Sequence, residues 1–143
     1  MAETQFLSRC DGCDDCREAC TQRIIVLTDG GYPQIDFLNG ECTFCGDCAR
    51  ACGEGALAWS PQATPWQVKA VVLPACLAQH GVVCRSCGEP CATGAIRFRF
   101  VKGGVAQPRV EPALCTGCGA CFAVCPARAI ALRDDPVYQE ACA

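Results

Sequence analysis

The chain has 143 residues and a formal net charge of −3, and 17 of its residues are cysteine. Its acidic balance lacks the excess of Lys and Arg that binding to nucleic-acid phosphates requires, so we expect no nucleic-acid partner. Without the cysteines, the hydrophobic share falls from 51% to roughly 39%, which is lean for a self-supporting core. A chain of this composition therefore needs cross-links, such as bound metal or disulfides, in addition to its hydrophobic core.

The amino-terminal stretch MAETQFLSRC has no basic n-region, apolar h-region or cleavage site, and the chain contains no Arg-Arg pair. These absences argue against an export signal. The apolar island AVVLP at residues 70–74 is much shorter than a membrane span, so we expect no membrane insertion. We therefore expect a soluble, cytoplasmic protein, whose thiols stay reduced and can hold metal.

The first group of cysteines has the spacing C-x2-C-x2-C-x3-C, at Cys10, Cys13, Cys16 and Cys20. This is the bacterial ferredoxin spacing, in which three thiolates bind one 4Fe-4S cluster and the fourth binds a second cluster. One run therefore implies a partner run. The acidic residues between these cysteines are interpreted as solvated loop positions, with a docking face as the alternative.

Residues 24–38, IIVLTDGGYPQIDFL, predict a β-hairpin, because an apolar run is followed by a Gly-Gly turn signal and an alternating segment. A second run with the same spacing follows at Cys42, Cys45, Cys48 and Cys52. Two runs and a hairpin complete a two-cluster module, which we place at residues 1–60.

Residues 61–75 are predicted to connect two modules, because the segment has three prolines, which prevent one regular helix, and no cysteine. Trp59 and Trp66 lie at and near its start. We interpret both as packed against a module or between modules, with exposed anchors for a partner as the alternative.

The third run is stretched, because seven residues rather than two separate its first two cysteines; its members are Cys76, Cys84, Cys87 and Cys91. A longer loop costs little entropy, so the first cysteine can still reach its cluster. His80, the one histidine of the chain, lies in the inserted loop LAQHGVV. We interpret it as a solvated loop residue rather than a cluster ligand.

Residues 94–115, GAIRFRFVKGGVAQPRVEPALC, repeat the hairpin of the first module, with Gly103-Gly104 as its turn. Phe98 and Phe100 share one face of its first strand, and Arg97 and Arg99 share the other. The arginines are interpreted as a solvated strand face, with a docking strip for an acidic surface as the alternative.

The fourth run is regular and comprises Cys115, Cys118, Cys121 and Cys125, with Pro126 directly after. The second module is placed at residues 76–134, and residues 135–143 form a tail. Cys142, in that tail, is the seventeenth cysteine and is expected to be a free thiol.

The crossed ligand rule assigns sixteen cysteines to four 4Fe-4S clusters. The first cluster takes Cys10, Cys13, Cys16 and Cys52, and the second takes Cys42, Cys45, Cys48 and Cys20. The third takes Cys76, Cys84, Cys87 and Cys125, and the fourth takes Cys115, Cys118, Cys121 and Cys91. Zinc and disulfides are the alternatives, but structural zinc sites use two separated pairs and disulfide frameworks suit secreted chains.

Aligned on their last cysteine, the four runs form a fourfold repeat, with small or aliphatic residues at the fourth and fifth places after it and a large apolar residue at the seventh. We therefore predict an α+β fold of two tandem bacterial-ferredoxin-like modules. Each has two cluster-binding loops, short helices and a small antiparallel β-hairpin, around a small core that the clusters nucleate.

The succession RCDGCDDCREAC, ECTFCGDCARAC, ACLAQHGVVCRSCGEPC and LCTGCGACFAVCPARAI resembles the NapF-type ferredoxin-like proteins of periplasmic nitrate reductase systems. The likeness extends from about Leu7 to Leu132, and the stretched third run is its most specific mark. It implies a cytoplasmic four-cluster protein that binds the molybdenum-containing catalytic subunit of the nitrate reductase. It also implies a role in maturing that subunit before export.

Two functions follow as hypotheses. The first is a maturation factor that supplies a cluster or electrons to the catalytic subunit of periplasmic nitrate reductase. The second is a general electron-transfer ferredoxin or an electron-wiring subunit of an oxidoreductase complex. The sequence shows no catalytic triad and no nucleotide-binding loop, so we expect a protein that is not an enzyme.

Overall fold

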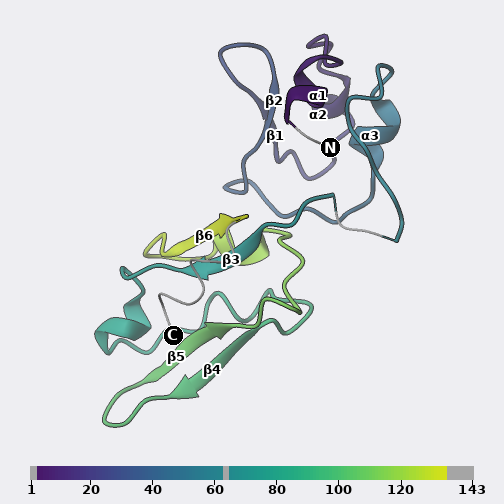
Figure 1. Ribbon diagram of the computed structural model, residues 1–143. Coiled ribbons are helices and arrows are strands. Elements are labelled where there is room, and N and C mark those ends of the chain that lie inside the picture. Colours follow the sequence, from purple (N-terminus) through teal and green to yellow (C-terminus); the bar gives the residue numbers. More distant parts are fainter. Residues whose placement is uncertain (1–2, 63–64, 135–143) are drawn as a thin grey trace. The chain divides into compact units, whose positions relative to one another are not determined.

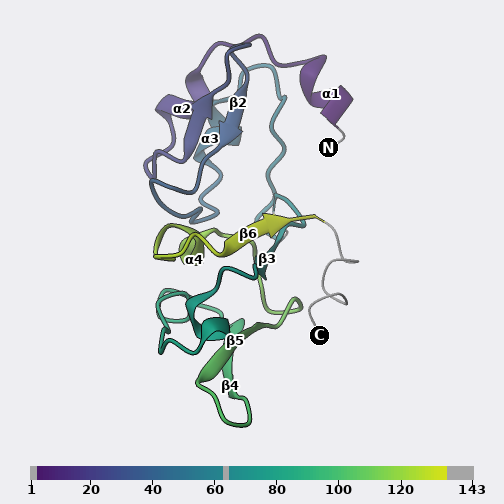
Figure 2. The same ribbon diagram turned by 90° about the vertical axis from the view of Figure 1, so that its left-hand side faces the viewer.

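The structure is a computed structural model and describes residues 3–62 and 65–134. It divides into two compact units, with the boundary between Pro65 and Trp66; unit 1 precedes this boundary and unit 2 follows it (Figures 1 and 2). Cys142 and the tail expected at residues 135–143 lie outside the described residues.

Unit 1 is built from three short helices and one β-hairpin. Its elements are α1 (Glu3–Leu7), α2 (Asp15–Glu18), β1 (Ile25–Leu27), β2 (Pro33–Ile35) and α3 (Asp47–Ala51). The strands pair antiparallel with Ile25 opposite Ile35, which confirms the hairpin expected over residues 24–38. Helices of four or five residues are not stable by themselves, so these must be held by what surrounds them.

Unit 2 has four strands that form two antiparallel pairs. Its elements are β3 (Lys69–Val72), the 3-10 helix η1 (Leu77–His80), β4 (Ile96–Phe100), β5 (Ala106–Val110), α4 (Ala120–Ala123) and β6 (Ile130–Arg133). The pair β4–β5 is the second expected hairpin, with Ile96 opposite Val110. The α+β character predicted from the repeat is therefore present in both units.

The other pair, β3–β6, joins the two ends of unit 2, and Figures 1 and 2 show these strands side by side. Val72 lies opposite Ile130, so the strand before the third run pairs with the strand after the fourth. Residues 69–72 fall inside the segment 61–75 that we expected as a connection. Its apolar run KAVV forms a strand because the prolines lie outside it and Ala70 and Val71 are buried.

The fourfold repeat is present in the backbone. In each repeat, the third residue after the last cysteine has a positive φ and its N–H donates a hydrogen bond to that cysteine's carbonyl oxygen. These residues are Arg23, Gly55, Gly94 and Arg128, with φ of 54°, 60°, 63° and 47° and N···O distances of 3.0, 3.2, 2.9 and 3.1 Å. The same turn therefore follows every cysteine run, with or without glycine.

The residue after each of these turns is the deepest point of its repeat. Ile24, Ala56, Ala95 and Ala129 are only 1–2% exposed. At the next position, Ile25, Ile96 and Ile130 are 4–7% exposed. Residues at the apolar fourth and fifth places thus contribute to both small cores, in which buried cysteines are also members; the contributing residues are Ile24, Ile25, Ile96 and Ile130.

Candidate metal centres

The three regular cysteine runs share one loop geometry. A residue with positive φ lies on each side of the second cysteine: Gly12 and Asp14, Phe44 and Gly46, and Gly117 and Gly119, with φ between 57° and 85°. Left-handed residues in such a loop turn successive backbone N–H groups toward a common concavity, an arrangement that suits anions and iron–sulfur centres. The helices α2, α3 and α4 begin directly after these loops.

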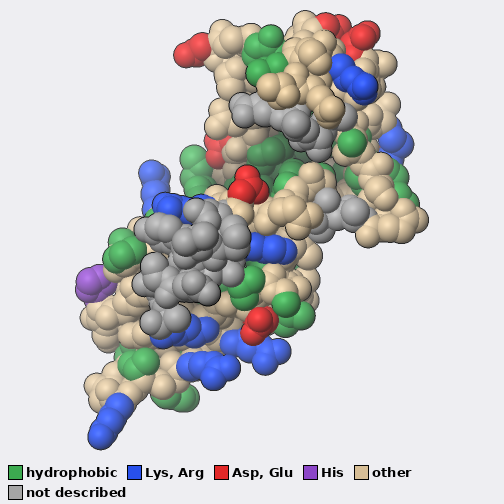
Figure 3. Space-filling view, in the orientation of Figure 1, with side chains coloured by type: hydrophobic (Ala, Val, Ile, Leu, Met, Phe, Trp, Pro, Cys, Tyr) green, Lys and Arg blue, Asp and Glu red, His purple; other side chains and the backbone are tan. Residues whose placement is uncertain are grey.

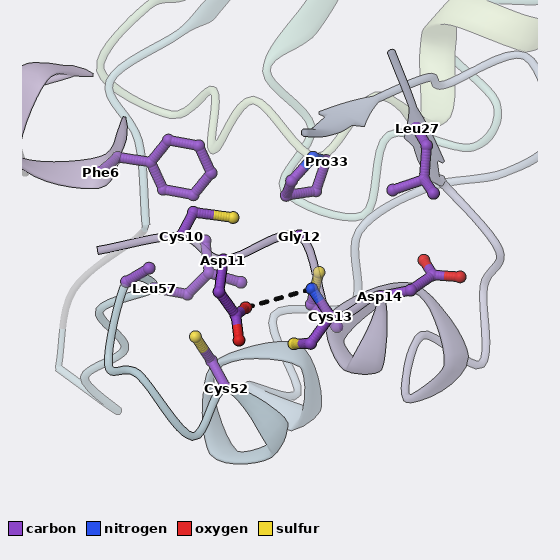
Figure 4. A pocket seen from close by; sticks show the side chains of 12 residues that line it. Phe6, Cys10, Asp11, Gly12, Cys13, Asp14, Leu27, Pro33, Cys52 and Leu57 are labelled. Carbon is purple, nitrogen blue, oxygen red and sulfur yellow. Dashed lines mark hydrogen bonds between the residues drawn. The ribbon is translucent and has the colours of Figure 1, made fainter. Parts of the chain in front are cut away.

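One cavity of unit 1 brings together four cysteines from two different runs (Figure 4). Three of them, Cys10, Cys13 and Cys16, come from the first run, and the fourth is Cys52, the last cysteine of the second run. The rest of the lining is mainly apolar and includes Phe6 of α1, Leu27, Pro33 and Leu57. This is the set of four sulfurs that the crossed rule expects at the first site.

A cavity of unit 2 repeats this arrangement around the stretched run. Cys76, Cys84 and Cys87 line it together with Cys125, the last cysteine of the fourth run. The inserted loop does not carry its first cysteine away, because it winds into η1 and buries Ala78 to 1% exposure. His80 is not among the lining residues, and its Nε2 lies 2.9 Å from the carbonyl oxygen of Pro74.

The remaining two sets are less enclosed. In unit 1, burial raises the pKa of Cys42, and the negative charges of Cys48, Cys45 and Cys20 raise it further, so Cys20 lies close to the second run. In unit 2, the partly buried Cys91 and Cys115 pack against the same apolar core that contains Cys121. Each set thus lies within one unit.

In three of the four runs the third cysteine is buried, whereas Cys48 of the second run is half-buried. Cys16, Cys87 and Cys121 are each 8% exposed, whereas Cys13 and Cys45, the second cysteines of unit 1, are exposed. Burial raises the pKa of Cys87 to about 11 and that of Cys121 to about 12. Without metal these thiols are protonated at neutral pH, so metal binding must release their protons.

Backbone N–H groups also point at several of these sulfurs. The N–H groups of Phe44 and Ala70 each lie 3.4 Å from a sulfur, that of Cys42 and that of Cys115 respectively. A third such bond runs from Ala129 N–H to Cys125 Sγ, at 3.1 Å. Hydrogen bonds of this kind stabilise thiolates and tune the reduction potential of an iron–sulfur centre.

The two tryptophans next to the module boundary each contact one cysteine loop. From the sequence we expected only that they pack against a module or between modules. Trp59 Nε1 donates to the carbonyl oxygen of Phe44 at 3.2 Å, and Trp66 Nε1 donates to that of Gly117 at 3.1 Å. Both acceptors directly precede the second cysteine of their run. The loops of the second and fourth runs thus make matching hydrogen bonds with a tryptophan.

The donor chemistry of the two cavities fits 4Fe-4S clusters. Four thiol groups surround each cavity, which is the ligand number that a cubane takes. Among the described residues, no group of three or more His, Cys, Asp or Glu side chains converges on a position for a single metal ion.

Comparison with known families and proteins gives the same chemistry for both units. Models of 4Fe-4S dicluster domains match residues 9–57 and residues 82–129. Two dicluster domains in tandem, with short helices and small antiparallel strand pairs, confirm the α+β ferredoxin-like fold. No solved structure matches the chain at a significant level.

Similar curated proteins include the ferredoxin-type protein NapF of Escherichia coli strain K12, which is 44% identical over 90% of this chain and 77% of its own length. The ferredoxin-type protein NapF of Haemophilus influenzae is 43% identical over 90% of this chain and 73% of its own length. A methylamine utilization ferredoxin-type protein, MauM of Methylophilus methylotrophus, is 34% identical over 93% of this chain and 66% of its own length.

None of the helices described in residues 3–62 and 65–134 combines the length and apolar character needed to cross a bilayer.

Proposed function

Since this chain belongs to the family of ferredoxin-type NapF proteins, we propose that it holds four 4Fe-4S clusters and assists the maturation of the catalytic subunit of periplasmic nitrate reductase. The proposed role is accessory and not enzymatic: the protein supplies a cluster or electrons to that subunit in the cytoplasm, before export. The single observation that carries the cluster content is the pair of cavities lined by four cysteines each.

The proposed ligands are the sixteen cysteines in their crossed sets. The first and third sets are supported by the two cavities, each of which has three sulfurs from one run and one from the other. The second set is supported by the electrostatic proximity of Cys20 to Cys42 and Cys48. We retain modules at residues 1–60 and 76–134, with β3 added to the second because it pairs with β6.

When bound, 4Fe-4S clusters supply one-electron transfer. The chain's own residues prepare for this in three ways. Cysteine thiolates fix the position of each site, N–H groups such as that of Ala129 donate to sulfur, and apolar side chains such as Phe6 and Leu27 exclude water from the first cavity. The exposed Cys13 and Cys45 leave one corner of each unit 1 site near the surface, which suits exchange with a partner.

The proposed function is tested by binding and transfer together. Protein purified without oxygen is mixed with the cluster-free catalytic subunit of periplasmic nitrate reductase, and complex formation and movement of radiolabelled iron to that subunit are measured. The expected result is binding followed by transfer of iron or electrons. Absence of binding, with fast and reversible reduction of all clusters by a low-potential donor, would favour a general electron carrier.

The crossed ligand sets are tested by combining cysteine variants. Cys125→Ser should lose about four iron atoms, those of one cubane. Adding Cys76→Ser should cause no further loss, because both cysteines serve the third site. Adding Cys115→Ser instead should double the loss. The reverse pattern would show that Cys125 ligates the fourth site and that the runs are not crossed.

A further inference from the structure

The outer face of the hairpin β4–β5 is rich in positively charged side chains. The pairing register places Arg97 directly opposite Arg109, and Arg99, two pairs further along on the same face, opposite Gln107. Neither Arg97 nor Arg99 forms an ion pair with a described residue.

The two units also differ in net charge, and unit 2 is the positive one. Residues 1–65 contain four Lys and Arg against ten Asp and Glu, whereas residues 66–143 contain eight against five. The two parts therefore carry −6 and +3 within a chain whose net charge is −3. Figure 3 shows Lys and Arg side chains gathered over the part of unit 2 where β4 and β5 lie.

The inner face of the same hairpin belongs to the third cysteine site. Pro108 of β5 lines the cavity of Cys76, Cys84, Cys87 and Cys125, while its neighbour Arg109 is exposed on the other face. The ring of Phe98 covers Gly88, next to Cys87 in the chain, and the Arg85 guanidinium lies 5.3 Å from the centre of that ring. A molecule bound to the outer face would thus be one strand layer away from the third site.

The tip of the hairpin adds an apolar anchor. Phe100, the last residue of β4, is 83% exposed, next to Arg99 and close to Lys102 in the turn. An exposed aromatic beside arginines is the composition found where protein interfaces concentrate their binding energy. The same composition suits a polypeptide surface better than a nucleic-acid backbone, because the covalently attached acidic unit 1 would repel a dense row of phosphates.

From these observations we propose that the outer face of β4–β5 around Arg97 and Arg99, together with the exposed Phe100 at the end of β4, is the docking surface for an acidic face of a partner protein. Docking there pairs Arg97 and Arg99 with acidic side chains and places the partner next to the third cluster site. The identification of that partner as the nitrate reductase catalytic subunit rests on the proposed function. The docking surface itself does not.

Two matched double variants test this surface in the full, anoxically prepared chain. Arg97→Glu/Arg99→Glu reverses the hairpin charge, and Arg9→Glu/Arg23→Glu makes the same change in net charge at exposed positions of unit 1. The probes are the catalytic subunit, immobilised poly-L-glutamate and duplex DNA, each at the same ionic strength. Iron and sulfide contents of both variants are measured first, and both should match the unaltered chain.

The hairpin variant should lose at least about tenfold in affinity for the catalytic subunit and for poly-L-glutamate, since reversed charges at a docked face repel the partner. The unit 1 variant should lose less than about twofold. If the unaltered chain does not bind the catalytic subunit but its binding to poly-L-glutamate depends on the hairpin arginines, the docking surface is supported and the proposed partner is refuted. If both variants bind the catalytic subunit equally well, the partner stands and the surface is refuted. Tighter binding to duplex DNA than to poly-L-glutamate would also refute it.

Discussion

Units 1 and 2 carry the same repeat but build cores of different size around it. The core of unit 2 has five buried members, drawn from the strands β3, β4 and β6 and from the cysteine runs, with eight partly buried hydrophobic residues packed on them. The core of unit 1 has three buried members and six partly buried ones. Similar cysteine patterns thus leave the two units with unequal amounts of polypeptide packing.

The difference comes from how each unit uses its ends. Unit 2 pairs β3, the strand before its first cysteine run, with β6, the strand after its second run. The first element of the described part of unit 1 is instead the short helix α1, whose Phe6 lines the first cavity. Its hairpin strands have three residues each, against five in β4 and β5. Unit 1 therefore depends more on the clusters it binds for its stability.

The largest expected effect is on the order of cluster loss. Under an anoxic chelator, iron should leave in two phases of about eight atoms each, with the unit 1 phase at least about tenfold faster. Hydrogen exchange of the full chain should show loss of protection at β1–β2 in the first phase, while β3–β6 stays protected, because regions with less buried packing open first. One phase for all iron, with simultaneous loss of protection in both units, would contradict the comparison.

The second prediction compares equivalent core positions. Ile25 and Ile96 are the fifth residues after Cys20 and Cys91 and are 6% and 7% exposed. Truncation to alanine at either site should cost roughly 2 to 5 kcal/mol in the free energy of unfolding, measured by anoxic denaturant titration. Only Ile25→Ala should also release iron at neutral pH without denaturant. Ile→Val at each position is the mild control, and equal iron retention in both alanine variants would oppose a weaker unit 1.

The third prediction concerns glycines that lie beneath the tryptophans. A Cβ at Gly117 would meet the backbone oxygen of Val68, whereas one at Gly46 would meet the ring of Trp59, which is 39% exposed and can move aside. Since φ is positive at both, alanine costs about 1 to 2 kcal/mol from the backbone alone. Gly117→Ala should therefore destabilise more than Gly46→Ala. Gly94→Ala, with positive φ and open space around its Cβ, measures the backbone cost alone.

The smallest expected effect is that of the indole donors. Trp66→Phe and Trp59→Phe each remove one hydrogen bond to a cysteine loop, worth about 1 kcal/mol. The Trp66 bond is partly buried and the Trp59 bond is exposed, so the unit 2 variant should lose more stability. Thermal unfolding under anoxic conditions compares them. A larger loss for Trp59→Phe would reverse the expected ranking of the two units.

The features that could be predicted from the sequence are those that covalent spacing dictates. The cysteine spacing, with two, two and three residues between successive cysteines, restricts where the sulfurs can lie. The fourth cysteine follows after a helical turn and must point toward the neighbouring run. The first and third sets each line one cavity, and the other two sets each lie within one unit. The two hairpins were equally readable, because Gly-Gly turns separate alternating strands.

Features that depend on long-range packing could not be read in this way. Strand β3 could not be recognised in a segment with three prolines, because the strand that pairs with it, β6, lies far along the chain. The exit turns at Arg23 and Arg128 carry positive φ without glycine, so no residue signal marks them. The tryptophan bonds to Phe44 and Gly117 likewise arise from tertiary placement, because their partners lie 15 and 51 residues away.

The measurement that tests the account most directly is the iron and acid-labile sulfide content of the full chain prepared without oxygen. Four cubanes held by sixteen cysteines predict about sixteen iron and sixteen sulfide per chain. Zinc in place of iron, or no more than about eight of each in protein that stays compact, would contradict a fold in which both units are assembled around clusters.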